Sequence, residues 1–479
     1  MKNTIQGRGK TLLYVLIFLI VFYLVELVTL VVSNNQILPI PSFINMFLIM
    51  GLYIWYMIQY RRKNILCFEL IFIPLFALCL VFEDLILVLA TTSVSGAFDN
   101  LQGGDSLHFK SMCVNMLGIL FFMLGLCVAN NKKYIVRSGN INLKVNNINL
   151  AYGFLSSLLS IFVTILFLYA YLTGAIKTWF QYGDGVSFVE SNLYVGTLTR
   201  YLLMCTIFEF AKLSQDGVDN FKSFLRKSNK IYLLDIVVTS GLLIVSGNRG
   251  EALQILFPFI VAYSIFISTL EKKSILVGLI IVGAIMVVSG WSRGTGEINV
   301  GRDNNLYEYT KDFGFVNINT EYLISYADKN GPDLANNILI YALSGIPFIG
   351  HFIVDLLGLK LSASAQVTTN GLQVIGNDSG LGTAVIGDLY YTGLLPFVIF
   401  FMFLLGYFLS RSYNKYYYEK SVNVWGLIAY LILIANSVYF IRDMWYRYLE
   451  IFIYDAIIIT VLGLVFQNKK KVTINIQSI

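Results

Sequence analysis

The sequence predicts an all-α polytopic membrane protein, a bundle of about twelve transmembrane helices with one large loop on the outer side. Hydrophobic residues make up 57% of the chain and charged residues only 13%, whereas a soluble domain carries about 25% charged residues. Apolar runs of about 20 residues, the length that crosses a bilayer as a helix, recur along the chain. The basic residues gather in short loops between these runs, which is typical of membrane topology rather than of nucleic-acid binding.

The apolar runs define the expected membrane spans. They are too long and too uniformly apolar for barrel strands, which would alternate. The first run is too long for a signal-peptide core and lacks a small-residue cleavage site, so we expect it to be retained as a helix. The expected spans are 11–33, 37–60, 65–92, 109–129, 150–172, 191–213, 231–247, 251–270, 275–292, 384–410, 422–441 and 448–466.

The loop charges predict the orientation of these spans. If the basic N-terminal segment is cytoplasmic, the loops after the even-numbered spans must be cytoplasmic too, and each of them is basic. Both termini are then cytoplasmic. The basic residues assigned to this side are Lys2, Arg8, Lys10, Arg61, Arg62, Lys63, Lys132, Lys133, Arg137, Lys144, Lys222, Arg226, Lys227, Lys230, Lys272, Lys273, Arg411, Lys415, Lys420, Lys469, Lys470 and Lys471.

One large loop, residues 293–383, falls on the outer side between the ninth and tenth spans. It divides the chain into 1–292 with nine spans, the loop itself, and 384–479 with three spans and a cytoplasmic tail. Loops of this length are usually functional or disordered, and its many tyrosines and phenylalanines favour order. Its apolar stretch Leu334–Leu361 is broken at Ser344-Gly345-Ile346-Pro347, which predicts either an interfacial or re-entrant helix pair or two further short spans.

Arginines mark the outer ends of the expected helices. Arginine holds phosphate oxygens through paired hydrogen bonds, so these residues are candidates for binding a pyrophosphate at the membrane boundary. The alternative is that they reach from helix ends to lipid headgroups. The candidates are Arg249, Arg293, Arg302, Arg442 and Arg447, and Arg200, which lies deeper in its span and has pairing with Glu83 or Asp84 as its own alternative.

The large loop also carries candidates for the other roles of a sugar-transfer site. Transfer to a hydroxyl needs a positioned base, usually a carboxylate or histidine. We expect the base among Glu321, Asp378 and His351, although His351 also fits a plain interfacial residue. Tyr322 and Trp445 are candidates for stacking on sugar faces, or members of an ordinary aromatic belt.

Several classes of protein find no support in the sequence. The five cysteines all lie inside apolar runs without paired spacing, so we expect neither a disulfide nor a cysteine metal site. No phosphate-binding glycine loop, metal-type histidine pair or clustered acidic pair diagnostic of a metal site is present, which argues against an ATP-driven pump and a nucleotide-sugar enzyme. We expect no metal, no cofactor and no nucleic-acid partner.

Four segments resemble the Wzy-type O-antigen polymerases. Ser246-Gly247-Asn248-Arg249-Gly250 is similar to the S-x-x-R-G turn that opens a membrane helix in that family. Tyr341–Pro347, Gly387–Gly393 and Phe440-Ile441-Arg442 resemble the segments that follow. The resemblance covers roughly residues 230–466. The family is often described with two large arginine-rich outer loops, whereas one is expected here, so roles do not transfer loop by loop.

The resemblance implies a fold like that of the C-type glycosyltransferases and a metal-independent, inverting glycosyltransferase of the bacterial inner membrane. Its donor and acceptor would be oligosaccharide repeat units on undecaprenyl pyrophosphate, joined into O-antigen or a related surface polysaccharide at the periplasmic face. Membrane lipids and a chain-length regulator protein are the implied partners. Two alternatives stay open, an O-antigen ligase and a lipid-linked oligosaccharide flippase. A ligase would use a basic loop with an essential histidine, and a flippase would need a central cationic cavity and two similar halves.

Overall fold

The computed structural model describes most of the apolar chain. For residues 82–89, 188–195, 249 and 306–315, among others, it describes the backbone alone. The described residues are 4–5, 10–33, 42–60, 67–89, 105–131, 134–135, 142–144, 152–176, 188–246, 249–270, 273, 278, 306–359 and 383–465. The predicted ninth span, 275–292, lies almost entirely outside them.

The chain forms two compact units, each built from segments on both sides of the predicted large loop. Unit 1 comprises Met1–Arg137, Gly294–Glu419 and Ile432–Ile453, and unit 2 comprises Ser138–Arg293, Lys420–Leu431 and Tyr454–Ile479. The boundaries fall inside α18 (Val424–Ala435) and α19 (Trp445–Val465), so each part of these two helices is described with its own unit.

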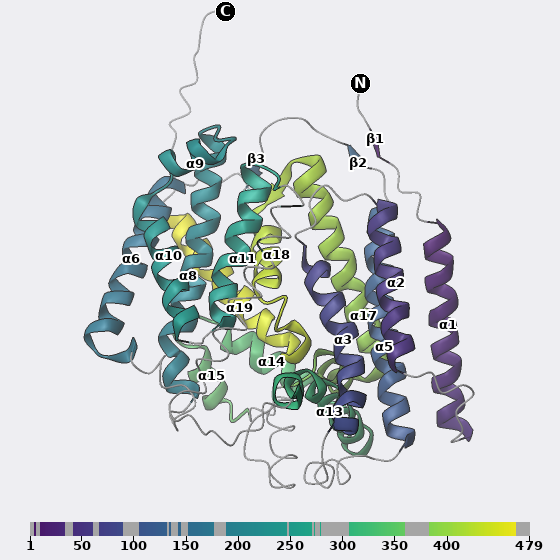
Figure 1. Ribbon diagram of the computed structural model, residues 1–479. Helices are drawn as coiled ribbons and strands as arrows, with labels where there is room; N and C mark the ends of the chain where they lie inside the picture. Colours follow the sequence, from purple (N-terminus) through teal and green to yellow (C-terminus); the bar gives the residue numbers. More distant parts are fainter. Residues whose placement is uncertain are drawn as a thin grey trace, which may run out of the picture. The chain divides into compact units, whose positions relative to one another are not determined.

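Unit 1 is a bundle of long helices that run side by side (Figure 1). Its long helices are α1 (Lys10–Ser33), α2 (Ser42–Tyr60), α3 (Phe68–Leu89), α5 (Asp105–Asn130) and α17 (Val385–Asn414). The side chains of α5 are buried along most of its length, whereas α1 leaves apolar side chains such as Phe18 and Val32 exposed. A soluble surface rarely carries such a continuous apolar face, and a lipid-facing surface does.

The helices α5 and α17 cross in very close contact. A Cβ on Gly125 would lie 2.2 Å from the carbonyl oxygen of Phe403, and one on Gly406 would lie 2.1 Å from that of Phe122. Glycine at both positions therefore lets the two backbones touch, as small residues do in membrane helix pairs. Beyond this crossing, Asn130 donates to Ser410 Oγ at 2.7 Å and accepts from Asn414 Nδ2 at 3.0 Å, which fastens the ends of the two helices.

Short strands join loop segments inside each unit. In unit 1, β1 (Thr4–Ile5) pairs antiparallel with β2 (Tyr134–Ile135), and in unit 2, β3 (Asn142–Lys144) pairs parallel with β4 (Ser421–Asn423). Each pair joins two segments that the basic loop pattern assigns to the same side of the membrane. The pairings agree with an even number of crossings between these segments, and the side itself stays a prediction.

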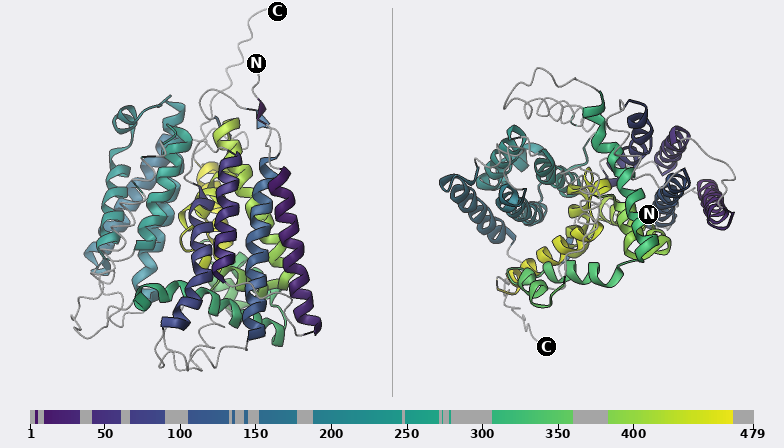
Figure 2. Two further views of the ribbon diagram at one scale, coloured as in Figure 1. Left: turned by 45° about the vertical axis from the view of Figure 1, so that its right-hand side comes forward. Right: turned by 90° about the horizontal axis from the view of Figure 1, so that it is seen from below.

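The described part of the large loop is helical. It holds α13 (Leu306–Asn330), α14 (Leu334–Ser344) and α15 (Gly350–Leu356). The view from below in Figure 2 shows α13 lengthwise and α1, α2, α3 and α5 end-on, so α13 lies across the ends of the unit 1 helices. At 1.5 Å per residue, α14 and α15 are too short to cross a bilayer, which leaves the interfacial or re-entrant alternative. The predicted break falls between them.

Two expected spans are interrupted. Inside α17, Gly393 and Leu394 leave the helical conformation, and Leu394 adopts the left-handed φ of 57° that residues with a side chain rarely take. The predicted span 422–441 is wrong in its second half, because α18 ends at Ala435 and the chain continues as a turn and the short 3-10 helix η2 (Phe440–Arg442). Asn436 and Ser437 occupy this turn as buried polar residues.

In the described part of unit 2, besides its portions of α18 and α19, four long helices and one short one pack together, as labelled in Figure 1. They are α6 (Tyr152–Leu172), α8 (Phe188–Gln215), α9 (Phe221–Lys227), α10 (Lys230–Val245) and α11 (Arg249–Phe266). Just after the end of α8, Gly217 takes a φ of 67° and allows Val218 N–H to bond back to the Leu213 carbonyl.

The chain is a helical membrane protein by the length and apolarity of its helices. Five described helices are long and apolar enough to cross a membrane: Lys10–Val32, Ser42–Tyr60, Ser106–Asn130, Tyr152–Leu172 and Val385–Glu419. The bent pair α9 and α10 would make a sixth. Eleven of the expected spans coincide with helices α1, α2, α3, α5, α6, α8, α10, α11, α17, α18 and α19. Twelve crossings therefore remain a proposal.

Candidate functional site

The helix α13 supplies one wall of the candidate site. Its middle packs into unit 1 because a continuous set of small, polar and apolar side chains is buried there, Val316 to Glu321 followed by Leu323 and Ile324. The first turn of α17 crosses it closely, and a Cβ on Gly387 would lie 2.8 Å from the Thr320 Cα. The Gly387 motif singled out in the sequence thus sets how near α17 comes to α13.

The central interaction of the site joins His108 of α5 to Glu321 of α13. His108 Nδ1 and Glu321 Oε1 lie 2.7 Å apart, with 33% and 5% of the two side chains exposed. Such a buried carboxylate needs a hydrogen-bonded partner to stay charged. The pair therefore holds a potential proton acceptor in a fixed position at the end of the bundle, where α13 crosses.

A small pocket of about 10 Å³, room for roughly one water molecule, lies beside this pair. Most of its lining residues are polar, and they are Ser42, Leu80, His108, Ser111, Met112, Asn115, Asn317 and Glu321. Asn115 Nδ2 donates to Asn317 Oδ1 at 3.3 Å, and Asn317 Nδ2 donates to the Cys79 carbonyl at 2.9 Å. Among the described residues, Ser111 Oγ has no hydrogen-bond partner although the residue is only 2% exposed. The pocket therefore offers unused hydrogen-bonding capacity next to Glu321.

A second polar cluster fixes the far end of α13. Lys110 Nζ lies 2.5 Å from Asp328 Oδ2, and Tyr390 donates its hydroxyl to Asp328 Oδ1 at 2.9 Å. Lys110 also lies 5.4 Å from the centre of the Tyr390 ring. One carboxylate thereby ties α5, α13 and α17 together, two turns of helix beyond Glu321, and holds the crossing helix in place.

The interrupted part of α17 binds the start of α19. Asp388 Oδ2 accepts from the backbone N–H of Trp445 at 3.1 Å, and Thr392 Oγ1 accepts from its indole Nε1 at 3.3 Å. Trp445 is 8% exposed and packs against Phe397 and Phe401, with ring centres 5.4 and 4.9 Å away. The indole of Trp445 is thus buried against other side chains, which leaves little surface for the predicted stacking on a sugar.

Tyr322, the other expected sugar-stacking residue, lies next to Glu321 on α13 and is half-buried. Its ring lies 6.4 Å from that of Tyr326, which in turn lies 5.8 Å from Tyr391. Burial, and then the neighbouring Tyr326, raise the pKa of Tyr322, so its hydroxyl stays neutral. Tyr322 is the aromatic candidate that remains accessible close to the pocket.

The expected arginines of unit 1 lie around η2. Arg447 is half-exposed and pairs with Asp443 at 3.1 Å, one turn earlier. Arg442 ends η2, where its carbonyl accepts from the Thr383 N–H at 3.3 Å. The helix η2 packs against α3, a helix that lines the pocket, because the ring centre of Phe440 lies 5.2 Å from that of Phe68 and 5.6 Å from that of Phe72. Arg442 therefore belongs to a segment that packs against a helix of the pocket wall.

The remaining expected residues lie elsewhere. His351 is exposed on α15 and does not line the pocket. Arg200 belongs to unit 2, where its guanidinium lies 5.0 Å from the centre of the Tyr454 ring. The structure does not describe the side chains of Glu83 and Asp84, the alternative partners expected for Arg200.

The other expected residues lie outside the part of the chain that the structure describes. Arg249 begins α11, but its side chain is not described, and Arg293, Arg302 and Asp378 are not described at all. The expected convergence of these arginines stays a prediction.

His108 is a functional candidate that the sequence pattern alone does not reveal. It stands alone at the start of an expected span, and its partner is 213 residues away in the sequence. The signal available in the sequence is that the chain has only two histidines and that this one shares the first turns of the helix with Lys110.

No protein-family model, curated protein or solved structure matches the chain. Within the part of the chain that the structure describes, no group of three His, Cys, Asp or Glu side chains is arranged to hold a metal ion. The geometry of unit 1 therefore carries the functional argument by itself.

Proposed function

We propose that this chain joins oligosaccharide repeat units carried on undecaprenyl pyrophosphate into a surface polysaccharide, at the outer face of the bacterial inner membrane. The observation that supports the proposal is the buried Glu321 carboxylate, bonded to His108 in a polar pocket where the loop helix α13 crosses the bundle. A carboxylate in such a place fits a general base for an acceptor hydroxyl.

In the proposed reaction, an acceptor sugar hydroxyl enters the pocket and gives its proton to Glu321. The hydroxyl oxygen attacks the anomeric carbon of the donor sugar from the side opposite the pyrophosphate, and the bond from that carbon to the pyrophosphate oxygen breaks. The products are the lengthened glycan, undecaprenyl pyrophosphate and protonated Glu321. His108 holds the carboxylate in one orientation, which is what a base needs before the proton moves.

The leaving pyrophosphate gains negative charge as the sugar bond breaks, and fixed cations stabilise that charge. Arg442 is our first candidate in unit 1 because η2 packs against α3, which lines the pocket, and Arg447 is the second. Arg200, Arg249, Arg293 and Arg302 complete the proposed pyrophosphate set on the sequence argument alone. Tyr322 is the proposed sugar-stacking residue.

The test of the function is the glycan profile of a deletion strain. A polymerase predicts that surface lipid carries single repeat units after deletion, because units are still made and attached. An O-antigen ligase predicts bare surface lipid with accumulated lipid-linked polymer, and a flippase predicts units retained on the cytoplasmic side. Restoring the chain with Glu321→Gln should leave the single-unit profile unchanged, and restoring it with Asp328→Asn should bring polymer back.

A further inference from the structure

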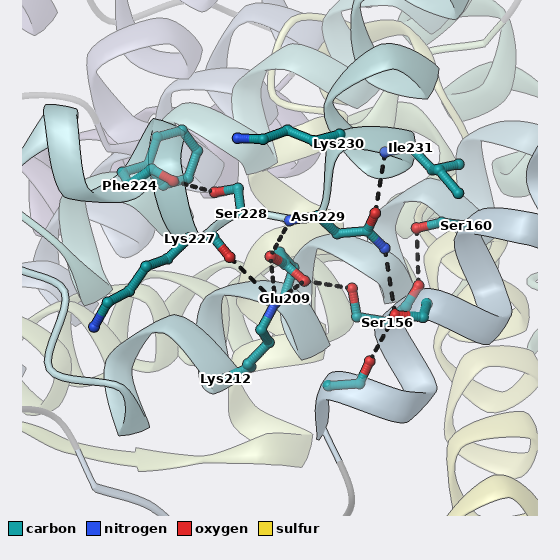
Figure 3. A network of polar contacts seen from close by, with 12 residues as sticks. Ser156, Ser160, Glu209, Lys212, Phe224, Lys227, Ser228, Asn229, Lys230 and Ile231 are labelled. Carbon is teal, nitrogen blue, oxygen red and sulfur yellow. Dashed lines mark hydrogen bonds and ion pairs between the residues drawn. The ribbon is translucent and has the colours of Figure 1, made fainter.

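The short helix α9 of unit 2 is held rigidly between α8 and α10 (Figure 3). Glu209, 0% exposed on α8, accepts from Ser156 Oγ at 2.6 Å and from the Asn229 backbone N–H at 2.8 Å, and pairs with Lys212 at 3.2 Å. Asn229 is the residue that caps the start of α10. The buried carboxylate thereby fastens the joint between α9 and α10 to both α8 and α6.

The other contacts of α9 fix its two ends. Lys227 Nζ donates to the Asp216 carbonyl at 2.9 Å, and Lys212 Nζ donates to the Lys227 carbonyl at 3.4 Å. Phe224 is buried and packs against Phe210, Phe259 and Tyr263, with ring centres 5.4 to 6.0 Å apart. A helix of this length is not stable by itself, so these contacts are what keep it folded and in one orientation.

That orientation is nearly perpendicular to the apolar helix that follows. The axes of α9 and α10 differ by 104°. If α10 crosses the membrane, α9 lies along the membrane surface, which is the geometry of an interfacial helix. The basic loop pattern assigns this surface to the cytoplasmic side.

The exposed side of α9 combines apolar and basic side chains. Phe221 is 60% and Leu225 43% exposed, one helical turn apart, while Lys222 and Arg226 are exposed on the neighbouring positions. Asp216 and Asp219 precede the helix, Lys227 ends it and Lys230 begins α10, so the segment keeps a net positive charge. Apolar side chains inserted at the interface beside basic ones are what an anionic bilayer surface binds.

We propose that α9 is a lipid-binding element that selects anionic phospholipid headgroups through Lys222 and Arg226, with Phe221 and Leu225 inserted below them. This role is independent of the reaction proposed for unit 1, because it concerns residues of unit 2 only. Binding of anionic lipid to α9 would then help to fix the position of the segment that connects α8 to α10.

The test uses the full chain in vesicles with a probe at Leu225. All five native cysteines are buried, so a fluorescent label can be attached to Leu225→Cys alone. Quenching is compared between vesicles with spin-labelled phosphatidylglycerol and vesicles with spin-labelled phosphatidylcholine. We expect phosphatidylglycerol to quench at least roughly threefold better, because each basic residue near the surface attracts anionic lipid. Equal quenching by the two lipids, or by neither, would overturn the proposal.

Charge variants test whether the difference in quenching between the two lipids is due to the basic residues of α9. Lys222→Gln with Arg226→Gln should bring the quenching ratio close to one, whereas the charge-preserving pair Lys222→Arg with Arg226→Lys should keep it. The matched control is Lys10→Gln with Lys415→Gln, two exposed basic residues that the loop pattern places on the same side of the membrane. A control that lowers the ratio as much as the α9 variant means a general charge effect and contradicts a role for α9.

Discussion

Glu209 and Glu321 are both buried carboxylates hydrogen-bonded to other side chains, yet their surroundings differ. Glu209 in unit 2 uses both oxygens on Ser156, Lys212 and the Asn229 backbone N–H. Glu321 in unit 1 lies beside a pocket and is bonded to the His108 side chain. A carboxylate whose bonds are all made inside the chain stabilises a fold, and one that faces unfilled space can act on a ligand.

The difference between Glu321 and Glu209 is tested most directly by Glu321→Gln, for which we expect the largest loss of activity. The amide cannot take a proton, so polymer formation from purified lipid-linked units should fall by at least about 100-fold, within the range for a lost general base. The amide keeps the size and polarity of the side chain, so the thermal midpoint should change little. Asp328→Asn, on the same helix, is the control and should retain most activity. Polymerisation at the normal rate by Glu321→Gln would remove Glu321 as the base.

Glu209→Ala should have the opposite effect to Glu321→Gln, lowering stability and leaving activity unchanged. Removing one partner from a buried, fully bonded ionic group costs about 3 kcal/mol of stability, here because Lys212 and the Asn229 N–H lose their acceptor. The measurement is the denaturation midpoint in detergent, set against activity per folded molecule, which should stay unchanged. A variant that is as stable as the original chain but inactive would show that Glu209, too, belongs to a functional site.

His108→Ala should have a smaller effect than loss of the base itself. The carboxylate remains but loses its orienting partner, and we expect the turnover number to fall by roughly tenfold to 100-fold with little change in KM, since the interaction matters in the transition state. His108→Asn places an amide donor near the position of Nδ1 and should recover part of the loss. Full activity in both variants would contradict a positioning role.

Ser111→Ala should have the smallest effect. Its hydroxyl has no hydrogen-bond partner among the described residues, so stability should change by less than about 0.5 kcal/mol. If the pocket binds an acceptor hydroxyl, the KM for acceptor should rise by roughly threefold to tenfold, the cost of one neutral hydrogen bond. Ser160→Ala, which removes a hydroxyl bonded to the Ser156 carbonyl, serves as the control with no expected change in KM.

Hydropathy predicted the lipid-facing helices because apolarity along a run is a local property. It did not predict α13 as a helix, since this segment mixes buried Asn317, Asn319 and Glu321 with apolar residues and lacks a long apolar run. It also placed the end of the span that contains α18 too late, because the apolar composition continues past Ala435 while the helix stops there. The bend of α9 depends on Glu209, a contact across 20 residues that no local pattern shows.

The candidate site was likewise predictable only where it depends on the local sequence. Glu321 emerged as a candidate because acids are scarce in the chain and the large loop is the place where a hydroxyl acceptor would arrive. The partnership with His108, the burial of Trp445 and the pairing of Arg447 with Asp443 depend on which helices meet. Such pairings are fixed by packing, so a single sequence reveals the residue types and not their partners.

The glycine crossing of α5 and α17 determines which part of unit 1 is able to move. Backbones that touch at Gly125 and Gly406, with Asn130, Ser410 and Asn414 tied beyond them, have no side chains between them to slide or repack, so the two helices behave as one rod. Under the proposed function, a repeat unit that reaches Glu321 would therefore have to displace α13 from its bonds to His108 and Lys110 rather than separate α5 from α17. The cycle of binding and release would then appear as motion of one crossing helix over a stationary pair.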